Sequence, residues 1–74
     1  MVKKADVNTL LEIAEKLKAI RIKQNLKQTD VAEKAGINGN YYAKIERGEA
    51  SLSVITLLKL TKALEVKTSK ILPN

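Results

Sequence analysis

The side chains that could carry out chemistry in this 74-residue chain are carboxylates, lysines, tyrosines, serines and threonines, because the sequence contains neither cysteine nor histidine. Without thiolates, neither disulfides nor thiolate metal sites can form. Without imidazoles, zinc binding and histidine acid–base catalysis are also excluded. No arrangement of the remaining residues favours catalysis. We therefore expect no enzyme, no metal site and no cofactor.

Positive charge is the more informative chemical feature of the chain. Lysine and arginine number 14 against 8 acidic residues, which gives a net charge of +6. The segment of residues 16–27 contains basic residues and no acidic one. A second basic segment, residues 59–70, contains a single acidic residue, Glu65. Because phosphate contacts release counterions, such clustering indicates a polyanionic partner. A solvated, lysine-rich surface that serves solubility explains the charge equally well.

The segment that could present polar side chains to such a partner is residues 27–48, KQTDVAEKAGINGNYYAKIERG. It predicts two short helices joined by a tight turn, in which Gly36 takes the positive φ. Ala32 is small where the two helices would cross. The residues spaced to close a small core are Val31, Ala35, Ile37, Tyr42 and Ile45. This pattern is typical of a helix-turn-helix, whose second helix is presented to the DNA major groove.

The rest of the chain predicts further helices around one core. We expect a flexible basic arm, residues 1–7, followed by a single all-α domain, residues 8–74, with the motif at about 28–47. The predicted helices cover residues 8–24, 28–35, 39–47, 54–64 and 69–72. Asn8, Asn38 and Ser53 are placed to cap the first, third and fourth of them. The predicted inward stripe of the fourth helix is Val54, Leu57, Leu58, Thr61 and Leu64.

Membrane insertion is not expected from this sequence. No apolar run approaches the ~18–20 residues of a membrane span. The first residues also lack the apolar stretch of a secretory signal. We expect a cytoplasmic protein with no membrane partner.

Over about residues 17–72, the sequence resembles the phage-repressor/Cro-like (XRE-type) helix-turn-helix family. The motifs that carry the resemblance are Arg21, Leu26-x-Gln28, Val31-Ala32, Gly36-Ile37, the IERG of residues 45–48 and the LLKLTKAL of residues 57–64. The stretch IERGEASLSVITLLKLTKALEV is also similar to controller proteins of restriction–modification systems. The resemblance implies a compact, five-helix, lambda-repressor-like DNA-binding domain.

The resemblance implies that the outward positions near the start of the third helix read bases. Asn40 could pair with adenine, and Lys44 could reach guanine or a phosphate. Tyr41 could stack on a sugar or a thymine methyl while its hydroxyl reaches a phosphate. Gly39 departs from the family, because a long polar side chain is often found there. The alternative for these positions is an ordinary polar helix face.

Other residues are candidates for phosphate contacts. Gln28 begins the second helix, where its side chain and the free N–H groups could approach a phosphate. The resemblance implies such a contact and also a bracing role; a solvent-exposed first-turn residue is the alternative. Arg47 could contact the DNA backbone, although the neighbouring Glu49 would repel the phosphates. The candidate DNA-binding residues are Lys27, Gln28, Thr29, Asn38, Gly39, Asn40, Tyr41, Lys44 and Arg47.

Two structural features follow from the same resemblance. Arg21 is expected to form a partly buried ion pair with Glu46, and loss of either partner would cost about 3–5 kcal/mol. In the family, the surface around the last helices commonly forms a two-fold dimer. The candidates for such a dimer here are Val66, Ile71, Leu72 and the outer face of the fourth helix, unless a monomer buries them in its own core.

The sequence therefore predicts a DNA-binding transcriptional regulator. We expect a homodimer that binds double-stranded DNA at a palindromic operator and acts as a repressor or autoregulatory controller, with no small-molecule effector. One alternative is a protein-interaction or antitoxin-type module on the same fold. Another is RNA or nonspecific nucleoid binding, which the hydrogen-bonding side chains of the third helix disfavour.

Overall fold

The computed structural model describes the backbone of residues 3–73 and the side chains of residues 8–73. Its elements are α1 (Lys3–Lys23), α2 (Gln28–Ala35), α3 (Gly39–Glu46), α4 (Val54–Leu64) and a 3₁₀ turn, η1 (Thr68–Lys70). No strand occurs in the described residues. None of the helices that they form is long and apolar enough to cross a membrane.

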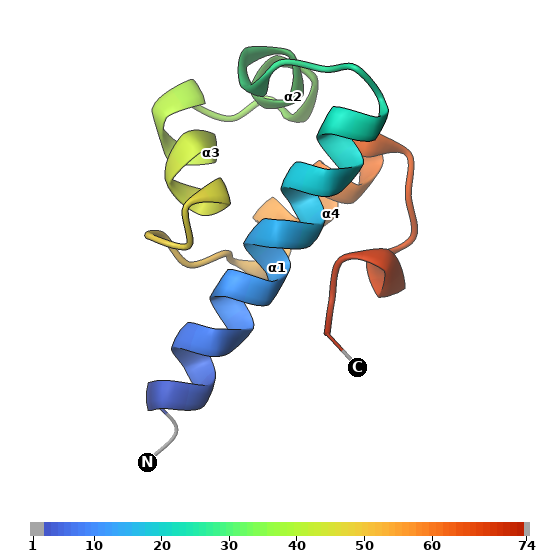
Figure 1. Cartoon of the computed structure of the whole chain (residues 1–74). Coiled ribbons are helices and arrows are strands. Elements are labelled where there is room, and N and C mark those ends of the chain that lie inside the picture. Colours follow the sequence, from blue (N-terminus) through green and yellow to red (C-terminus); the bar gives the residue numbers. More distant parts are fainter. Residues whose placement is uncertain (1–2, 74) are drawn as a thin grey trace.

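Helix α1 is the longest element and runs along the length of the molecule (Figure 1). Its 21 residues span about 31 Å at the usual helical rise, close to the 36 Å longest dimension of the molecule. Helix α3 packs against α1 and α2, and α2 packs against α4. The turn that follows α4 brings the C-terminal segment back beside α1, where the Lys16 ammonium donates to the Leu72 carbonyl at 3.1 Å.

One hydrophobic core is formed by all of these elements. Its fully buried side chains include Leu17 from α1, Val31 from α2, Tyr42 from α3 and Leu60 from α4. Ile71, which follows η1, closes the core from the C-terminal side and is also fully buried. A chain this short has room for only one such core, so each helix must contribute to it.

The four α-helices of the described residues all end in the same hydrogen-bonded motif. After α2, the Gly36 N–H donates to the Glu33 carbonyl at 3.2 Å and the Ile37 N–H donates to the Ala32 carbonyl at 3.0 Å. This is the Schellman motif, in which a left-handed residue ends the helix. The left-handed residues are Asn25, Gly36, Gly48 and Glu65. The predicted break at Asn25 and turn at Gly36 are therefore present.

The helix starts depend on side-chain caps. Asn38 Oδ1 accepts from the Tyr41 N–H at 3.1 Å and begins α3. Ser53 Oγ accepts from the Thr56 N–H at 3.0 Å and begins α4. Both caps agree with the sequence prediction. The predicted helix start at Asn8 is wrong, because α1 already begins at Lys3.

Residues 3–7 of the predicted arm thus have helical backbone, and residues 1–2 lie outside the described residues. Lys3, Lys4 and Ala5 all have high helix propensity, so nothing in the sequence obliges the helix to stop at Asn8.

The five-helix count is also wrong, because the described residues contain four α-helices and the single turn η1. Only three residues form η1. Pro73 lies three residues after the end of η1, and a proline disfavours helical backbone at the residue before it, here Leu72. The Leu72 N–H donates to the Thr68 carbonyl at 3.0 Å, so one turn is closed before Pro73, but no longer α-helix follows in the described residues.

The predicted inward stripe of α4 is partly wrong. Val54 and Leu58 are 72% and 52% exposed, whereas Leu60, which was not in the stripe, is fully buried. Apolar residues occur on every side of this helix, so periodicity alone admits more than one inward face. The packing of α4 against α2 selects the face with Leu60, Thr61 and Leu64.

The glycines of the helix-turn-helix provide a matched test of backbone strain. A Cβ atom would meet nothing within 4 Å at either Gly36 or Gly39, but only Gly36 has a left-handed φ, of +71°. We expect Gly36→Ala to lower the free energy of unfolding by about 1 kcal/mol. Gly39→Ala should leave it unchanged or raise it by about 0.5 kcal/mol, because alanine favours helix.

Urea denaturation of the two variants measures this difference. Equal stability of both variants would contradict the assigned backbone geometry.

Candidate nucleic-acid interface

The turn between α2 and α3 holds the two helices in a fixed relation. Only three residues, Gly36, Ile37 and Asn38, separate them. Gly36 ends α2 and Asn38 caps α3, so both helix termini are closed by local hydrogen bonds. Ile37 packs against the core between them. This geometry leaves the first turn of α3 facing solvent.

Two predicted base-reading side chains on α3 are exposed and unengaged. Asn40 and Lys44 lie four residues apart, on one face of the helix. Within the described part of the chain, neither side chain makes a hydrogen bond or an ion pair. Gly39 is exposed beside them and has open space around the position of a Cβ atom. This face of α3 can therefore accept an external hydrogen-bonding partner without first breaking an internal contact.

Three other predicted contacts are already engaged within the chain. The Asn38 side chain is the cap of α3. The Tyr41 hydroxyl donates to the Ser51 carbonyl at 3.0 Å and ties α3 to the loop before α4. Arg47 Nε donates to Glu49 Oε1 at 3.0 Å. These side chains could contact a ligand only alongside, or in place of, their present partners.

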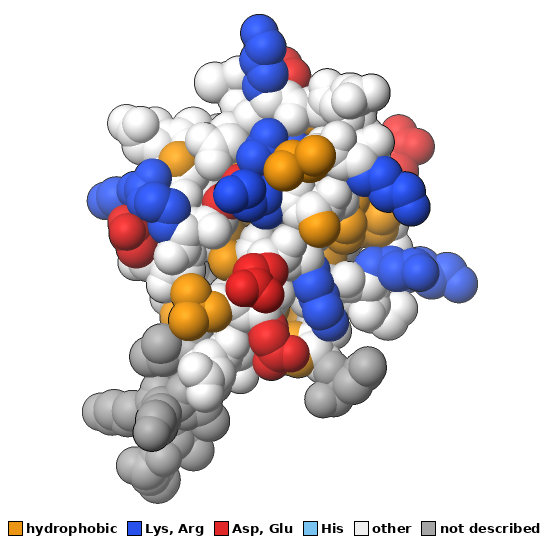
Figure 2. Space-filling view, viewed as in Figure 1, with side chains coloured by type: hydrophobic (Ala, Val, Ile, Leu, Met, Phe, Trp, Pro, Cys, Tyr) orange, Lys and Arg blue, Asp and Glu red, His pale blue; other side chains and the backbone are white. Residues whose placement is uncertain are grey.

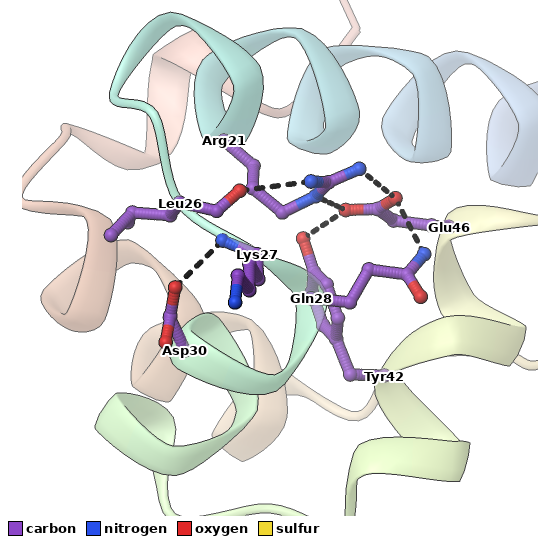
Figure 3. Close-up of polar contacts among 7 residues, drawn as sticks. All are labelled: Arg21, Leu26, Lys27, Gln28, Asp30, Tyr42 and Glu46. Atoms are coloured by element: carbon purple, nitrogen blue, oxygen red, sulfur yellow. Dashed lines mark hydrogen bonds and ion pairs between the residues drawn. The ribbon is translucent and has the colours of Figure 1, made fainter.

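The two side chains expected to pair, Arg21 and Glu46, lie together (Figure 3). Arg21 Nε donates to Glu46 Oε2 at 2.6 Å and Nη2 donates to Oε1 at 3.1 Å, an arrangement with both carboxylate oxygens engaged. Arg21 Nη1 also donates to the Leu26 carbonyl at 2.9 Å. The Glu46 side chain is only 2% exposed and that of Arg21 13%. The pair thus joins the end of α1 to the end of α3.

Two further side chains donate hydrogen bonds to the Glu46 carboxylate. Gln28 Nε2, from the start of α2, donates to Oε1 at 3.0 Å. The Tyr42 hydroxyl, one turn before Glu46 on α3, donates to Oε2 at 2.5 Å. This is the partner of Tyr42 that the sequence did not identify, although the four-residue spacing on one helix is a signal that could have found it. The Gln28 side chain thus braces α3.

The remaining candidates lie at the start of α2. Lys27 and Thr29 are exposed on either side of Gln28. The Lys27 N–H donates to the Asp30 carboxylate at 2.8 Å, which closes the N-terminus of α2. Lys27, Thr29 and the outer face of α3 are therefore available to the same external partner.

The basic residues do not form a single block on the face seen in Figure 2. Lysine and arginine side chains are spread over it, with acidic side chains between them, and exposed apolar side chains appear at several separate places. On this face the positive charge is therefore spread out and not gathered in one patch.

A family model described as helix-turn-helix matches residues 17–71, which include every element of this site. The chain belongs to this XRE-type helix-turn-helix family. Among its relatives, Control protein C.SmaI of Serratia marcescens is 35% identical over 60 residues, which are 81% of this chain and 71% of that protein. The Immunity repressor protein of Bacillus phage phi105 is 36% identical over 61 residues, or 82% of this chain but only 42% of the repressor.

A solved helix-turn-helix structure has the same arrangement of elements. The restriction–modification controller protein C.AhdI from Aeromonas hydrophila matches with a TM-score of 0.82 and 27% identity. The match covers 84% of this chain and 94% of C.AhdI. The similarity therefore extends over nearly the whole controller and not only over its helix-turn-helix.

The dimer candidates of this helix-turn-helix chain differ in exposure. Leu72 is exposed and Val66 is partly buried. Ile71 is fully buried in the core of the single chain, which is the alternative that the sequence left open, so it is not available to a dimer interface. The outer face of the fourth helix, which the sequence also offered, includes Ile55, 67% exposed on α4. Together with Val54 and Leu58, Ile55 forms an exposed apolar face, here called the α4 face.

The protonation states of the buried network follow from its contacts. Burial alone would raise the pKa of Glu46, but hydrogen bonds from Arg21, Tyr42 and Gln28 outweigh it and hold the pKa below its ordinary value. Burial, followed by the contact with Glu46, raises the pKa of the Tyr42 hydroxyl well above its ordinary value. The network thus keeps a carboxylate, a guanidinium and a neutral phenol together at neutral pH.

The adjacent tyrosines allow the network to be tested with matched variants. We expect Tyr42→Phe to lower the free energy of unfolding by about 1.5–3 kcal/mol, because a buried charged acceptor loses a donor. Tyr41→Phe should cost about 0.5–1 kcal/mol, since its hydroxyl bonds a neutral carbonyl of an exposed residue. Chemical denaturation of both variants measures the difference. A larger loss in Tyr41→Phe would contradict the central role of Glu46.

Proposed function

We propose that this protein is a sequence-specific transcriptional regulator that binds double-stranded DNA by placing α3 in the major groove. The observation that carries the proposal is the exposed, unengaged pair Asn40 and Lys44 on a helix whose other side is fixed by Glu46. An asparagine amide matches the N6 and N7 atoms of adenine, and a lysine ammonium matches the acceptors of guanine. Rigid placement of such groups favours discrimination between bases.

Contacts to the DNA backbone would orient α3 in the groove. Lys27 and Thr29 are exposed at the start of α2, where the free N–H groups of the first turn attract a phosphate. Gln28 would contribute through its backbone N–H, because its side-chain amide is bonded to Glu46. Such contacts set position and affinity but carry no direct sequence information.

We further propose that the protein binds a palindromic operator as a homodimer. The α4 face supports this, because Val54, Ile55 and Leu58 are more than half exposed and share one side of the helix. A second copy that covers this face would shield the apolar area from water. A two-fold dimer would place two α3 helices at half-sites about 34 Å apart.

A role as a repressor or autoregulatory controller is the regulatory form that the relatives favour. One relative is named a control protein and another an immunity repressor. We propose that the operator lies close to the promoter of the protein's own gene. A promoter–reporter fusion with and without the protein tests this, and unchanged reporter output would reject it.

The function as a whole is tested by selecting bound duplexes from a random DNA library at two salt concentrations. We expect a palindromic motif with half-sites about one helical turn apart. Binding that falls with salt and yields no motif would reject sequence-specific reading. In that case a protein-interaction role for the α4 face would become the better hypothesis.

The base-reading role of α3 is tested by Asn40→Ala and Lys44→Ala. Each should reduce the preference for the selected motif over a mismatched duplex by about 1–3 kcal/mol. Lys27→Ala is the control, because a lost phosphate contact weakens both duplexes equally. Fluorescence anisotropy titrations measure the two affinities. An equal loss on both duplexes for an α3 variant would assign that residue to the backbone.

The dimer is tested by placing a charge on the α4 face. Ile55→Glu should dissociate the dimer, because a dimer would bury the new carboxylate without a partner. Ile22→Glu is the matched control: Ile22 is 54% exposed on α1, outside the α4 face. Sedimentation velocity with and without the selected duplex measures the assembly. Dimers that persist in Ile55→Glu would show that another surface forms the interface.

A further inference from the structure

Glu49 is unlike the residues at the corresponding position of the other helix ends. In the Schellman motif the residue after the left-handed one usually makes an apolar contact. Here that position is occupied, from α1 to α4, by Leu26, Ile37, Glu49 and Val66. The three apolar residues pack against the core. Glu49 alone is exposed, so packing does not account for it.

The helix-ending motif nevertheless fixes where Glu49 lies. Its N–H donates to the Lys44 carbonyl at 2.9 Å, while the Gly48 N–H donates to the Ile45 carbonyl at 3.0 Å. These bonds hold the backbone of Glu49 against the last turn of α3. Its carboxylate is thereby placed beside the Arg47 guanidinium, with 3.0 Å between Oε1 and Nε.

The Arg47–Glu49 pair contributes little to the fold. Its side chains are 52% and 56% exposed, in contrast to the buried pair of Arg21 and Glu46. Exposed pairs of this kind typically contribute about 0.2–1 kcal/mol. Neither burial nor stability explains a carboxylate at this place. Its main effect is electrostatic: it neutralises a guanidinium at the end of the helix that carries Asn40 and Lys44.

We propose that Glu49 is an internal competitor of DNA phosphate for Arg47. This inference rests on the proposed DNA-binding function. A phosphate that approaches the end of α3 must displace the Glu49 carboxylate from Arg47 or bind without that guanidinium. The pair is weak enough to open, but its presence lowers the affinity for every DNA sequence. Glu49 therefore sets affinity, whereas Asn40 and Lys44 set sequence preference.

The test is the variant Glu49→Gln, titrated against the selected duplex and against a mixed-sequence duplex of equal length. Both should bind more tightly at moderate salt, by about two- to fivefold, the upper part of the range that corresponds to an exposed ion pair. The slope of log affinity against log salt should become steeper by about 0.9, because Arg47 now neutralises one further phosphate. The ratio of the two affinities should not change.

Two controls separate competition for Arg47 from a general change of charge. Glu65→Gln makes the same charge change after the C-terminal end of α4, a helix about 16 Å long, and should change affinity less than Glu49→Gln does. In an Arg47→Ala background, Glu49→Gln should alter affinity by less than about twofold. A gain of equal size in that background would overturn the proposal in favour of simple repulsion between Glu49 and DNA.

The outcomes distinguish this inference from the proposed function. If the protein binds duplexes and Glu49→Gln changes neither affinity nor salt slope, the competitor role falls and the DNA-binding function stands. If the protein yields no sequence motif but Glu49→Gln still strengthens binding through Arg47, the sequence-specific function falls and the competitor role stands. If the wild-type protein binds no duplex at any salt concentration, both fall.

Discussion

The arrangement of the first three helices depends on the hydrogen bonds that the buried Glu46 carboxylate accepts. This carboxylate accepts hydrogen bonds from Arg21 beside the end of α1, from Gln28 at the start of α2 and from Tyr42 on its own helix. A buried charge is tolerable only when its hydrogen-bonding capacity is satisfied. Movement of any one of these helices would therefore leave Glu46 short of donors, and this penalty keeps their relative orientation fixed.

This constraint separates the two sides of α3. The inward side supplies Tyr42, Ile45 and Glu46 to the core and the network. The outward side carries Asn40 and Lys44, whose side chains make no hydrogen bond or ion pair within the described part of the chain. Side chains at the edges, such as Tyr41, are engaged with neighbouring loops. Because contacts on the inward side hold α3 in place, residues on its outward side can vary without changing the orientation of the helix.

The sequence predicts well those features that depend on neighbouring residues. The bounds of α2, the cap at Asn38, the cap at Ser53 and the left-handed residues at 25 and 36 all follow from local residue types. Features set by tertiary packing were harder to predict. The inward face of α4 was partly misassigned because that helix is apolar all round, and the burial of Ile71 depends on where the C-terminal segment docks. For the site, residue types indicated which side chains could bind, but not which were already engaged within the chain.

The open space at Gly39 bears on how such a protein could change over evolutionary time. A side chain added there meets no neighbouring atom, and its backbone does not have the left-handed conformation that only glycine adopts easily. New side chains at this position therefore arise without a folding penalty that other substitutions would have to compensate. With α3 as the proposed DNA-reading helix, one codon change at this position could alter the preferred target while the rest of the protein stays the same.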